Sequence, residues 1–322
     1  MNRNPADIYT IDTHYLGLAE VAAAYLIVDG DRAAFADNNT NEAVPRLLAA
    51  LADRGLTPEQ VDYLIITHVH LDHAGGTSAL ARACPNAQVV AHPRAAPHVI
   101  DPTKLVASAS AVYGQAEFER LYGTIDPVAE DRVMVMEDEQ TLRLGGRELR
   151  FLHTRGHANH HFCIVDTATN AIFSGDAFGL VYPALQGEGT FAIPSTSPTD
   201  FEPELARESI RRLVSERPSC IYPTHFGAVT DIEVAAGQLI RHLDFAERLR
   251  GDAENSDRPD EALEAYCRAR LFDYFAGLLD SMGNLGRDAN TWSHLKLDID
   301  LNAQGIAFAA NKRRRKARTA GG

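Results

Sequence analysis

The sequence has no long apolar run and no segment composed like a secretory signal. No stretch approaches the roughly 18 consecutive apolar residues that a membrane-spanning helix needs. The first ten residues, MNRNPADIYT, lack the apolar core of a signal peptide. We therefore expect a cytoplasmic protein that does not contact a membrane.

Cysteine is scarce, and its spacing excludes two classes of small stabilised domain. The four cysteines are widely separated and form no CxxC pair; they are Cys84, Cys163, Cys220 and Cys267. A disulfide framework is typical of small, cysteine-dense secreted domains, and a cysteine-ligated zinc site typically uses CxxC pairs, so neither is expected here. We expect four buried free thiols.

Basic charge is also limited, because 31 Lys and Arg face 44 Asp and Glu, a net charge of −13. A nucleic-acid-binding surface needs a basic patch that neutralises phosphates, so the composition argues against nucleic acid as a partner. One basic cluster, NKRRRKAR, runs from Asn311 to Arg318. From its position we expect residues 312–322 to form a disordered basic tail.

Short apolar runs alternate with helical patterns over the first 230 residues, which predicts a layered α/β domain. Within it, residues 93–130 carry prolines at both ends and a helical middle, so we expect a helical insertion there. Residues 231–311 change pattern and predict a C-terminal helical extension. Its last stretch, LKLDIDLNAQGIAFAA, alternates apolar and polar residues and is interpreted as a closing hairpin.

The stretch THVHLDHAGG, residues 67–76, crowds four potential metal ligands into one short turn after a buried strand. His68 and His70 alternate in an extended segment, so both rings can reach one point. Asp72 and His73 follow in the turn, and two glycines permit tight backbone geometry beyond it. Two imidazoles for one metal, and a carboxylate with an imidazole for a second, suit Zn²⁺; Fe²⁺ or Mn²⁺ would also accept this set.

Three further candidate ligands follow predicted strands. His157 lies in the loop TRGHANHH, Asp176 just past the strand AIFSG, and His225 just past the strand CIYP. In an open layered fold, ligands assemble from loops at one edge of the sheets. These residues therefore predict a metal centre built from distant parts of the chain.

This order of motifs resembles the metallo-β-lactamase superfamily over roughly residues 15–230: HxHxDH, a Gly-His loop, Gly-Asp and a late histidine. The resemblance implies a four-layer αββα sandwich with its metal site at one edge. It also implies that all seven ligand positions are filled. The first metal would take His68, His70 and His157, the second Asp72, His73 and His225, and Asp176 would bridge them.

The resemblance further implies two Zn²⁺ ions and a metal-bridging hydroxide that Asp72 helps to orient, acting on a small-molecule substrate. The expected activity is hydrolysis of a small ester, thioester or lactone. The insertion after residue 93 is similar to that of an uncharacterised branch near the glyoxalase-II and lactonase groups. The alternative on the same fold is an iron-bearing redox or sulfur-handling protein.

Residues flanking the ligands suggest how the site is supported. In relatives, a histidine often stands where His161 stands, and we expect it to hydrogen-bond behind the ligands. Lactonases acting on acyl-homoserine lactones carry a tyrosine where this chain has Gly179, which departs from that pattern. Tyr182 is a nearby substitute, and we expect Tyr182 and Phe178 to line the substrate pocket.

Overall fold

The computed structural model describes residues 7–187, 189–196, 201–283 and 289–320, and the chain divides into two compact units. Unit 1 comprises Met1–Thr154, His160–Gly175 and Arg217–Thr230. Unit 2 comprises Arg155–Asn159, Asp176–Glu216 and Asp231–Gly322. This division differs from the single boundary expected at residue 230, because two segments of the predicted first domain group with the C-terminal helices.

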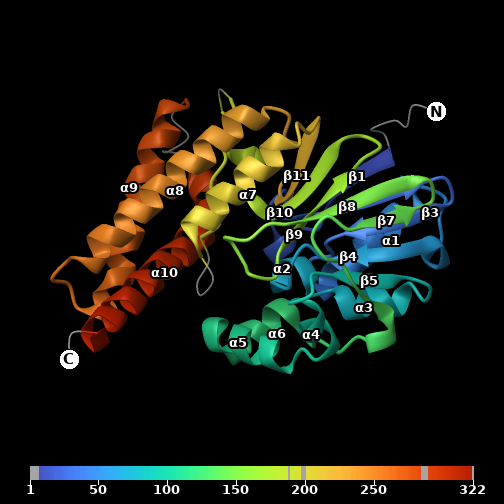
Figure 1. The fold of residues 1–322 in the computed structure, drawn as a ribbon, viewed down its shortest axis with the longest axis horizontal. Coiled ribbons are helices and arrows are strands. Elements are labelled where there is room, and N and C mark those ends of the chain that lie inside the picture. The colour runs from blue at the N-terminus through green and yellow to red at the C-terminus, as the bar shows by residue number, and fades with distance from the viewer. Residues whose placement is uncertain (1–6, 188, 197–200, 284–288, 321–322) are drawn as a thin grey trace. The chain divides into compact units, whose positions relative to one another are not determined.

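Two β-sheets make up the strands of the fold (Figure 1), and all of their residues belong to unit 1 except the end of β10 from Asp176 onward. The first sheet contains β1 (Ile8–Asp12), β2 (Ala23–Asp29), β3 (Arg32–Ala36), β4 (Val61–Ile65), β5 (Gln88–Ala91) and β6 (Val133–Val135), in that order. The second has the order β11-β10-β9-β8-β7, with β7 (Thr141–Leu144), β8 (Arg147–His153), β9 (Phe162–Asp166), β10 (Ala171–Leu180) and β11 (Cys220–His225). The first sheet is mixed: β1 to β3 pair antiparallel and β3 to β6 pair parallel.

The strands of the first sheet are apolar on both faces because both faces are covered. In β2, Tyr25 and Ile27 point into a core shared with the second sheet, which contributes Phe151 and Phe173 among others. The alternate residue Leu26 points into a second core beneath the helices of unit 1. Side chains of a strand alternate between faces, so a continuous apolar run is what burial on both faces requires.

The helices of unit 1 include the expected insertion. They are α1 (Val44–Ala52), α2 (Leu71–Ala74), α3 (Thr77–Ala83), α4 (Ala96–Ile100), α5 (Thr103–Tyr113) and α6 (Gln115–Tyr122). The last three form the predicted helical segment between residues 93 and 130. Its end is anchored to the rest of the unit, since the Tyr122 hydroxyl lies 2.9 Å from that of Tyr15 and Asn41 donates to the Thr124 carbonyl at 2.9 Å.

Unit 2 is mainly helical, with α7 (Pro203–Ser215), α8 (Ile232–Glu254), α9 (Leu263–Ser281) and α10 (Ala289–Ala320) (Figure 1). Arg207 of α7 is almost fully buried and forms ion pairs with Asp244 and Glu247 of α8. These pairs join α7 to α8, so residues 201–216 group with the C-terminal helices. Among the residues that the structure describes, no helix combines the length and the apolar character needed to cross a bilayer.

The hairpin expected over residues 295–310 is wrong, because this stretch belongs to α10. The pattern LKLDIDL alternates, but burial does not follow it: Leu295 and Ile299 are buried, whereas Leu297 between them is 37% exposed. The buried positions continue at Ala303, Ile306 and Ala310, a spacing of three and four residues that marks one helical face.

The disordered basic tail expected at residues 312–322 is also wrong as far as Ala320, because α10 continues to that residue. Arg314 is buried and binds the end of α8. Its guanidinium donates to the carbonyls of Ala253, Glu254 and Arg258 at 2.6, 2.9 and 2.7 Å. Carbonyl groups at a helix C-terminus have no partner within the helix, so this arginine caps α8 from another helix.

We predict that Arg314→Ala lowers the free energy of unfolding by about 2–4 kcal/mol, because one buried and two partly buried carbonyls lose a charged donor. Chemical denaturation followed by circular dichroism measures the change. The control is Arg315→Ala, which removes an exposed charge from the next position and should cost less than about 0.5 kcal/mol. Equal effects of the two substitutions would contradict the capping role.

A buried histidine makes the stability of unit 2 depend on pH. Burial, assisted by the charge of Arg241, lowers the pKa of His242 to about 4. Its Nδ1 lies 2.8 Å from the Tyr274 hydroxyl. As the pH falls, the unfolded chain takes up this proton first, near pH 6.5, and the folded chain only near pH 4. Stability is therefore full above pH 6.5 and falls between pH 6.5 and 4.

We predict that His242→Gln, which keeps a polar side chain at this position, removes this part of the pH dependence. Between pH 7 and 5 the wild-type chain should lose up to about 2 kcal/mol more stability than the variant, from this one group. Denaturant midpoints at the two pH values measure the difference. Parallel losses in both proteins would show that His242 does not titrate in this way.

Candidate metal centre

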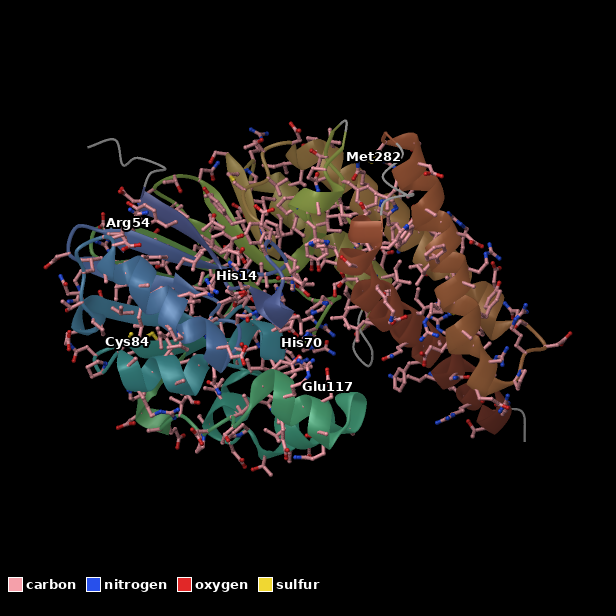
Figure 2. The ribbon with its side chains drawn as sticks, turned by 180° about the vertical axis from the view of Figure 1, so that it is seen from behind. His14, Arg54, His70, Cys84, Glu117 and Met282 are labelled. Atoms are coloured by element: carbon pink, nitrogen blue, oxygen red, sulfur yellow. The ribbon has the colours of Figure 1, made fainter. Side chains whose placement is uncertain are left out.

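The motif THVHLDH leaves the end of β4 and forms a single helical turn. His70 stands at the N-cap of α2, and Asp72 and His73 lie within that helix. Figure 2 shows His70 and Arg54, which follows α1, on opposite sides of unit 1. A Cβ atom on Gly76 would lie 2.8 Å from the Thr40 carbonyl oxygen. Glycine is required here because the two backbone segments approach closely; the φ angle of Gly76 is one that any residue can adopt.

The segment after β3 fixes this turn in place. The backbone amides of Asn38 and Asn39 donate to the His73 carbonyl at 2.9 and 3.1 Å. The Asn39 side chain donates to the Asp72 carbonyl at 2.8 Å. The backbone of both candidate ligands is therefore held by the neighbouring strand end.

Three side chains of unit 1 form a group with the geometry of a metal site. Asp72, His73 and His225 each offer one ligand atom, and these atoms lie within 4.8 Å of one another. The Asp72 Oδ2 atom is 3.3 Å from His225 Nε2 and 3.7 Å from His73 Nε2. Both imidazoles are buried, whereas a quarter of the Asp72 side chain is exposed. Two nitrogens and one oxygen with one partly open side match the donor set of a catalytic zinc ion.

The rings of His68 and His70 lie beside this group. Their centroids are 4.4 Å apart, and the His68 ring is 4.1 Å from that of His73. His68 also offers a ring nitrogen within 4.8 Å of one of His70 and one of His73. Five of the seven predicted ligands, including Asp72 and His225, thus lie close together in unit 1.

The other two predicted ligands, His157 and Asp176, belong to unit 2. His157 lies in the loop after β8, as predicted, and its Nε2 is 3.4 Å from Asp176 Oδ2. Asp176 does not follow a strand as expected, because β10 continues through it to Leu180. The apolar residues after Asp176 extend this strand, and Leu180 pairs with Ile193 through two backbone hydrogen bonds.

Hydrogen bonds to the Nδ1 atoms leave the Nε2 atoms of the rings facing the candidate site. His73 Nδ1 lies 2.8 Å from the Asp37 carboxylate, and His225 Nδ1 lies 2.8 Å from the Val21 carbonyl oxygen. An imidazole that donates Nδ1–H to such an acceptor keeps a lone pair on Nε2, the arrangement usual for histidine ligands of a metal. The residues present therefore fit a metal ion at this group.

Asp37 is a supporting residue that the sequence analysis missed. Its buried carboxylate accepts hydrogen bonds from the Thr67 amide at 2.8 Å and from the Thr224 hydroxyl at 2.6 Å, besides its contact with His73. The sequence signal was present: Asp37 directly follows a strand, as the ligand motif does.

His161 lies beside the ligands, where a histidine was expected to give support. Its ring centroid is 4.9 Å from that of His68, and its Nδ1 is 2.8 Å from the Thr154 hydroxyl. Gly175 makes room for it, since a Cβ there would lie 2.6 Å from His161 Nε2 and 2.6 Å from Thr67 Oγ1. The glycine before Asp176 is thus required by the packing of these two side chains.

The predicted pocket residues are both buried within unit 2. Phe178 is fully buried, and the Tyr182 hydroxyl donates to Asp298 Oδ2 at 3.0 Å. A Cβ at Gly179 would lie 2.4 Å from the Ile193 carbonyl oxygen and 2.5 Å from the Leu239 side chain. No larger side chain fits at position 179.

A further histidine pair in unit 1 lies at the ends of β5 and β8. The rings of His92 and His153 have centroids 4.1 Å apart. Burial, together with the neighbouring His153 and His160, lowers the pKa of His92 to about 3. His92 is therefore neutral near pH 7, and its Nδ1 accepts a hydrogen bond from the Arg94 backbone amide at 3.0 Å.

Three curated relatives are similar to this chain. A metallo-beta-lactamase fold-containing protein of Sulfurisphaera tokodaii is 27% identical over 53% of this chain and 63% of its own. An atrochrysone carboxyl ACP thioesterase of Emericella nidulans is 24% identical over 68% and 56%. A hydroxyacylglutathione hydrolase of Rhodopseudomonas palustris is 30% identical over 52% and 52%. The chain thus spans less than two thirds of the length of each.

The fold and the family agree with these similarities. The crystal structure of an archaeal metallo-beta-lactamase superfamily protein from Sulfolobus tokodaii superposes with a TM-score of 0.64 at 20% identity, covering 93% of this chain and 97% of the other. The two sheets with their helices and the C-terminal helical extension match that fold. A family model described as the metallo-beta-lactamase superfamily matches residues 19–225, more than half of the sequence. The chain therefore belongs to the metallo-beta-lactamase superfamily.

Proposed function

We propose that the protein is a dinuclear metal-dependent hydrolase that cleaves a small ester, thioester or lactone. The observation that carries this proposal is the group of Asp72, His73 and His225, whose imidazoles are oriented through their Nδ1 atoms. The relatives named as a thioesterase and as a hydrolase support the reaction class.

The ligand assignment we propose is the one that the sequence pattern implies. One zinc ion would bind His68, His70 and His157. A second would bind Asp72, His73 and His225, and Asp176 would bind both ions. For His157 and Asp176 the support is their residue type, their order in the family pattern and their 3.4 Å separation within unit 2. Iron or manganese would also accept these ligands.

When bound, the metal ions would lower the pKa of a water molecule toward neutrality and polarise the substrate carbonyl. Asp72, the partly exposed carboxylate of the group, would orient that water as a hydrogen-bond acceptor. Water then adds to the acyl carbon, the bond from that carbon to oxygen or sulfur breaks, and a proton from the water passes to the departing atom. An ester or thioester gives a carboxylic acid with an alcohol or a thiol, and a lactone gives a single hydroxy acid. Asp37 takes no part in bond breaking and holds the His73 ring in position.

The first test measures metal content and turnover together. Protein purified without added metal should carry two zinc ions per chain and hydrolyse members of a panel of p-nitrophenyl esters, thioesters and lactones. His225→Ala should lose about one zinc and lower kcat/KM by more than about a hundredfold. His14→Asn is the matched control, because His14 is exposed and asparagine tolerates its left-handed backbone.

Two results would contradict the proposal. Full turnover by His225→Ala with both metal ions retained would remove His225 from the site. Bound iron with visible absorbance, and no hydrolysis across the panel, would favour the redox alternative.

The second test concerns the support of His73. We predict that Asp37→Asn weakens zinc binding about 10- to 100-fold in a chelator competition, because the ring loses its charged acceptor. Asparagine also suits the positive φ of 56° at this position. Asp62→Asn is the control, since Asp62 pairs with Arg32 and contacts none of the candidate ligands. Unchanged zinc affinity in Asp37→Asn, with the fold intact, would exclude this supporting role.

A further inference from the structure

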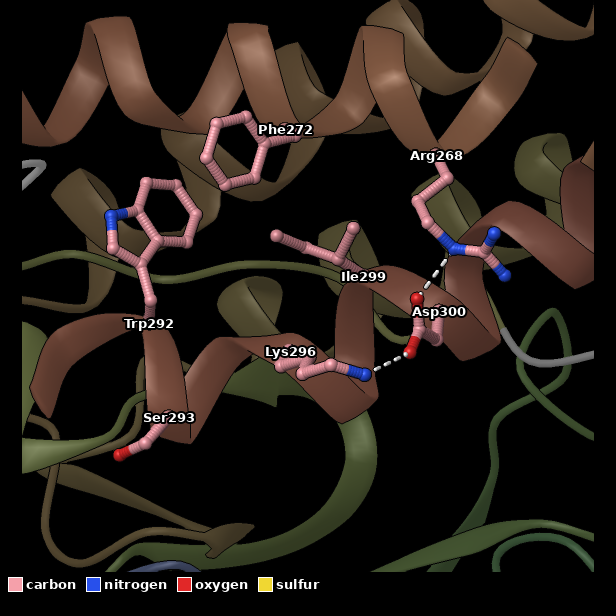
Figure 3. Close-up of a pocket in the computed structure, with 7 residues that line it drawn as sticks. All are labelled: Arg268, Phe272, Trp292, Ser293, Lys296, Ile299 and Asp300. Atoms are coloured by element: carbon pink, nitrogen blue, oxygen red, sulfur yellow. Dashed lines mark hydrogen bonds and ion pairs between the residues drawn. The ribbon is translucent and has the colours of Figure 1, made fainter. Parts of the chain in front are cut away.

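An open cleft between α9 and α10 lies wholly within unit 2 and contains none of the proposed metal ligands (Figure 3). Its volume is about 640 Å³, within the range of sites for small molecules. Arg268 of α9 pairs with Asp300 of α10, and Phe272, one turn after Arg268, contacts Trp292, about two turns before Asp300. The two helices therefore run antiparallel here. The cleft therefore has two ends of different chemistry.

One end of the cleft is aromatic. The rings of Phe272 and Trp292 are stacked, with centroids 4.3 Å apart and planes inclined by 26°. Phe272 is 46% exposed, although a large apolar side chain is usually buried. Ile299 lies between the aromatic end and the charged end in Figure 3. This end offers apolar surface on which a ring or a branched chain can pack.

The other end is charged. Arg268 Nε donates to Asp300 Oδ1 at 2.6 Å, and Lys296 Nζ donates to Asp300 Oδ2 at 3.0 Å. Both oxygens of Asp300 are thus used, and Glu264 also pairs with Arg268, so two carboxylates balance the two cations at this end. In the Arg268 guanidinium, Nε donates to Asp300 and one terminal nitrogen donates to Glu264. The Nη1 group of Arg268 and two hydrogens of the Lys296 ammonium can still donate.

The separation of the two ends sets the length of a ligand. Arg268 and Phe272 are four residues apart on α9, as are Trp292 and Lys296 on α10, which corresponds to about 6 Å along a helix. We propose that this cleft binds a small amphipathic monoanion, a carboxylate whose aromatic or branched apolar body lies about 6 Å from its charge. The body packs on Phe272 and Trp292, and the carboxylate accepts hydrogen bonds from Arg268 and Lys296.

This binding does not depend on the proposed hydrolysis. The donors that remain belong to two cations, and a paired contact with two cations favours a carboxylate over a neutral amide of the same shape. Acids of this class are also what ester or thioester cleavage releases. Binding of such an acid in the cleft is nevertheless expected whether or not the protein is a hydrolase.

Trp292 provides the measurement, because it is the only tryptophan in the chain. The probe is 4-phenylbutyrate, titrated into the full-length protein while tryptophan emission is followed. We expect a saturable change in emission, with binding at least about tenfold tighter than that of 4-phenylbutyramide, which lacks the charge, or of butyrate, which lacks the ring.

Substitutions separate the two ends of the cleft. Lys296→Gln, at a side chain that is 80% exposed, should weaken binding of the carboxylate about tenfold and leave the amide unchanged. Phe272→Ala should weaken both ligands. Arg315→Gln and Phe308→Ala are matched controls, because they remove an exposed cation and an exposed aromatic side chain of α10 outside the cleft.

Three outcomes would overturn the proposal. The first is an emission that does not respond to 4-phenylbutyrate up to millimolar concentration. The second is equal affinity of the wild-type chain and Lys296→Gln for the carboxylate. The third is an emission that changes with protein concentration alone, together with a sedimentation mass that falls to the monomer value in Phe272→Ala, which would make the cleft a contact between two copies of this chain.

Discussion

The buried carboxylate of Asp37 is the interaction on which the candidate site depends. It collects hydrogen bonds from residues 30, 36 and 187 positions away, which are Thr67, His73 and Thr224. A carboxylate buried without partners would cost several kcal/mol, so these donors must be in place when the chain is folded. Because Thr67 precedes the HxHxDH turn and Thr224 precedes His225, satisfying one charge also aligns the strand ends that carry the ligands.

The same contact explains what the sequence could and could not reveal. HxHxDH was recognisable because its ligands are neighbours in the chain and because their types suit a metal. Asp37 offers only its place after a strand, since its partners come from two distant segments, residues 67–73 and Thr224, that only the folded sheets bring to it. Gly175 is a similar case: its role is to leave space for His161 and Thr67, and neither is near it in the sequence.

The C-terminal region shows where local patterns mislead. LKLDIDL alternates as a strand does, yet Leu295 and Ile299 lie on the buried face of a helix and Leu297 does not. Only partners outside the segment decide between these interpretations, and here α8 and α9 supply them. The basic cluster Asn311–Arg318 misleads for the same reason, since nothing in its own sequence shows that Arg314 reaches the end of α8.

The surroundings of Gly179 narrow the proposed substrate further than the metal ligands do. The superfamily's acyl-homoserine lactonases are expected to carry a tyrosine there, but a side chain at position 179 would collide with the Ile193 carbonyl and with Leu239. Tyr182 does not replace it, because its buried hydroxyl is bonded to Asp298. With no phenol supplied from either position, the hydrolysis proposed here is better matched to an open-chain ester or thioester than to a homoserine lactone. Substrate choice then depends on residues outside the ligand set, as is usual when many reactions share one fold.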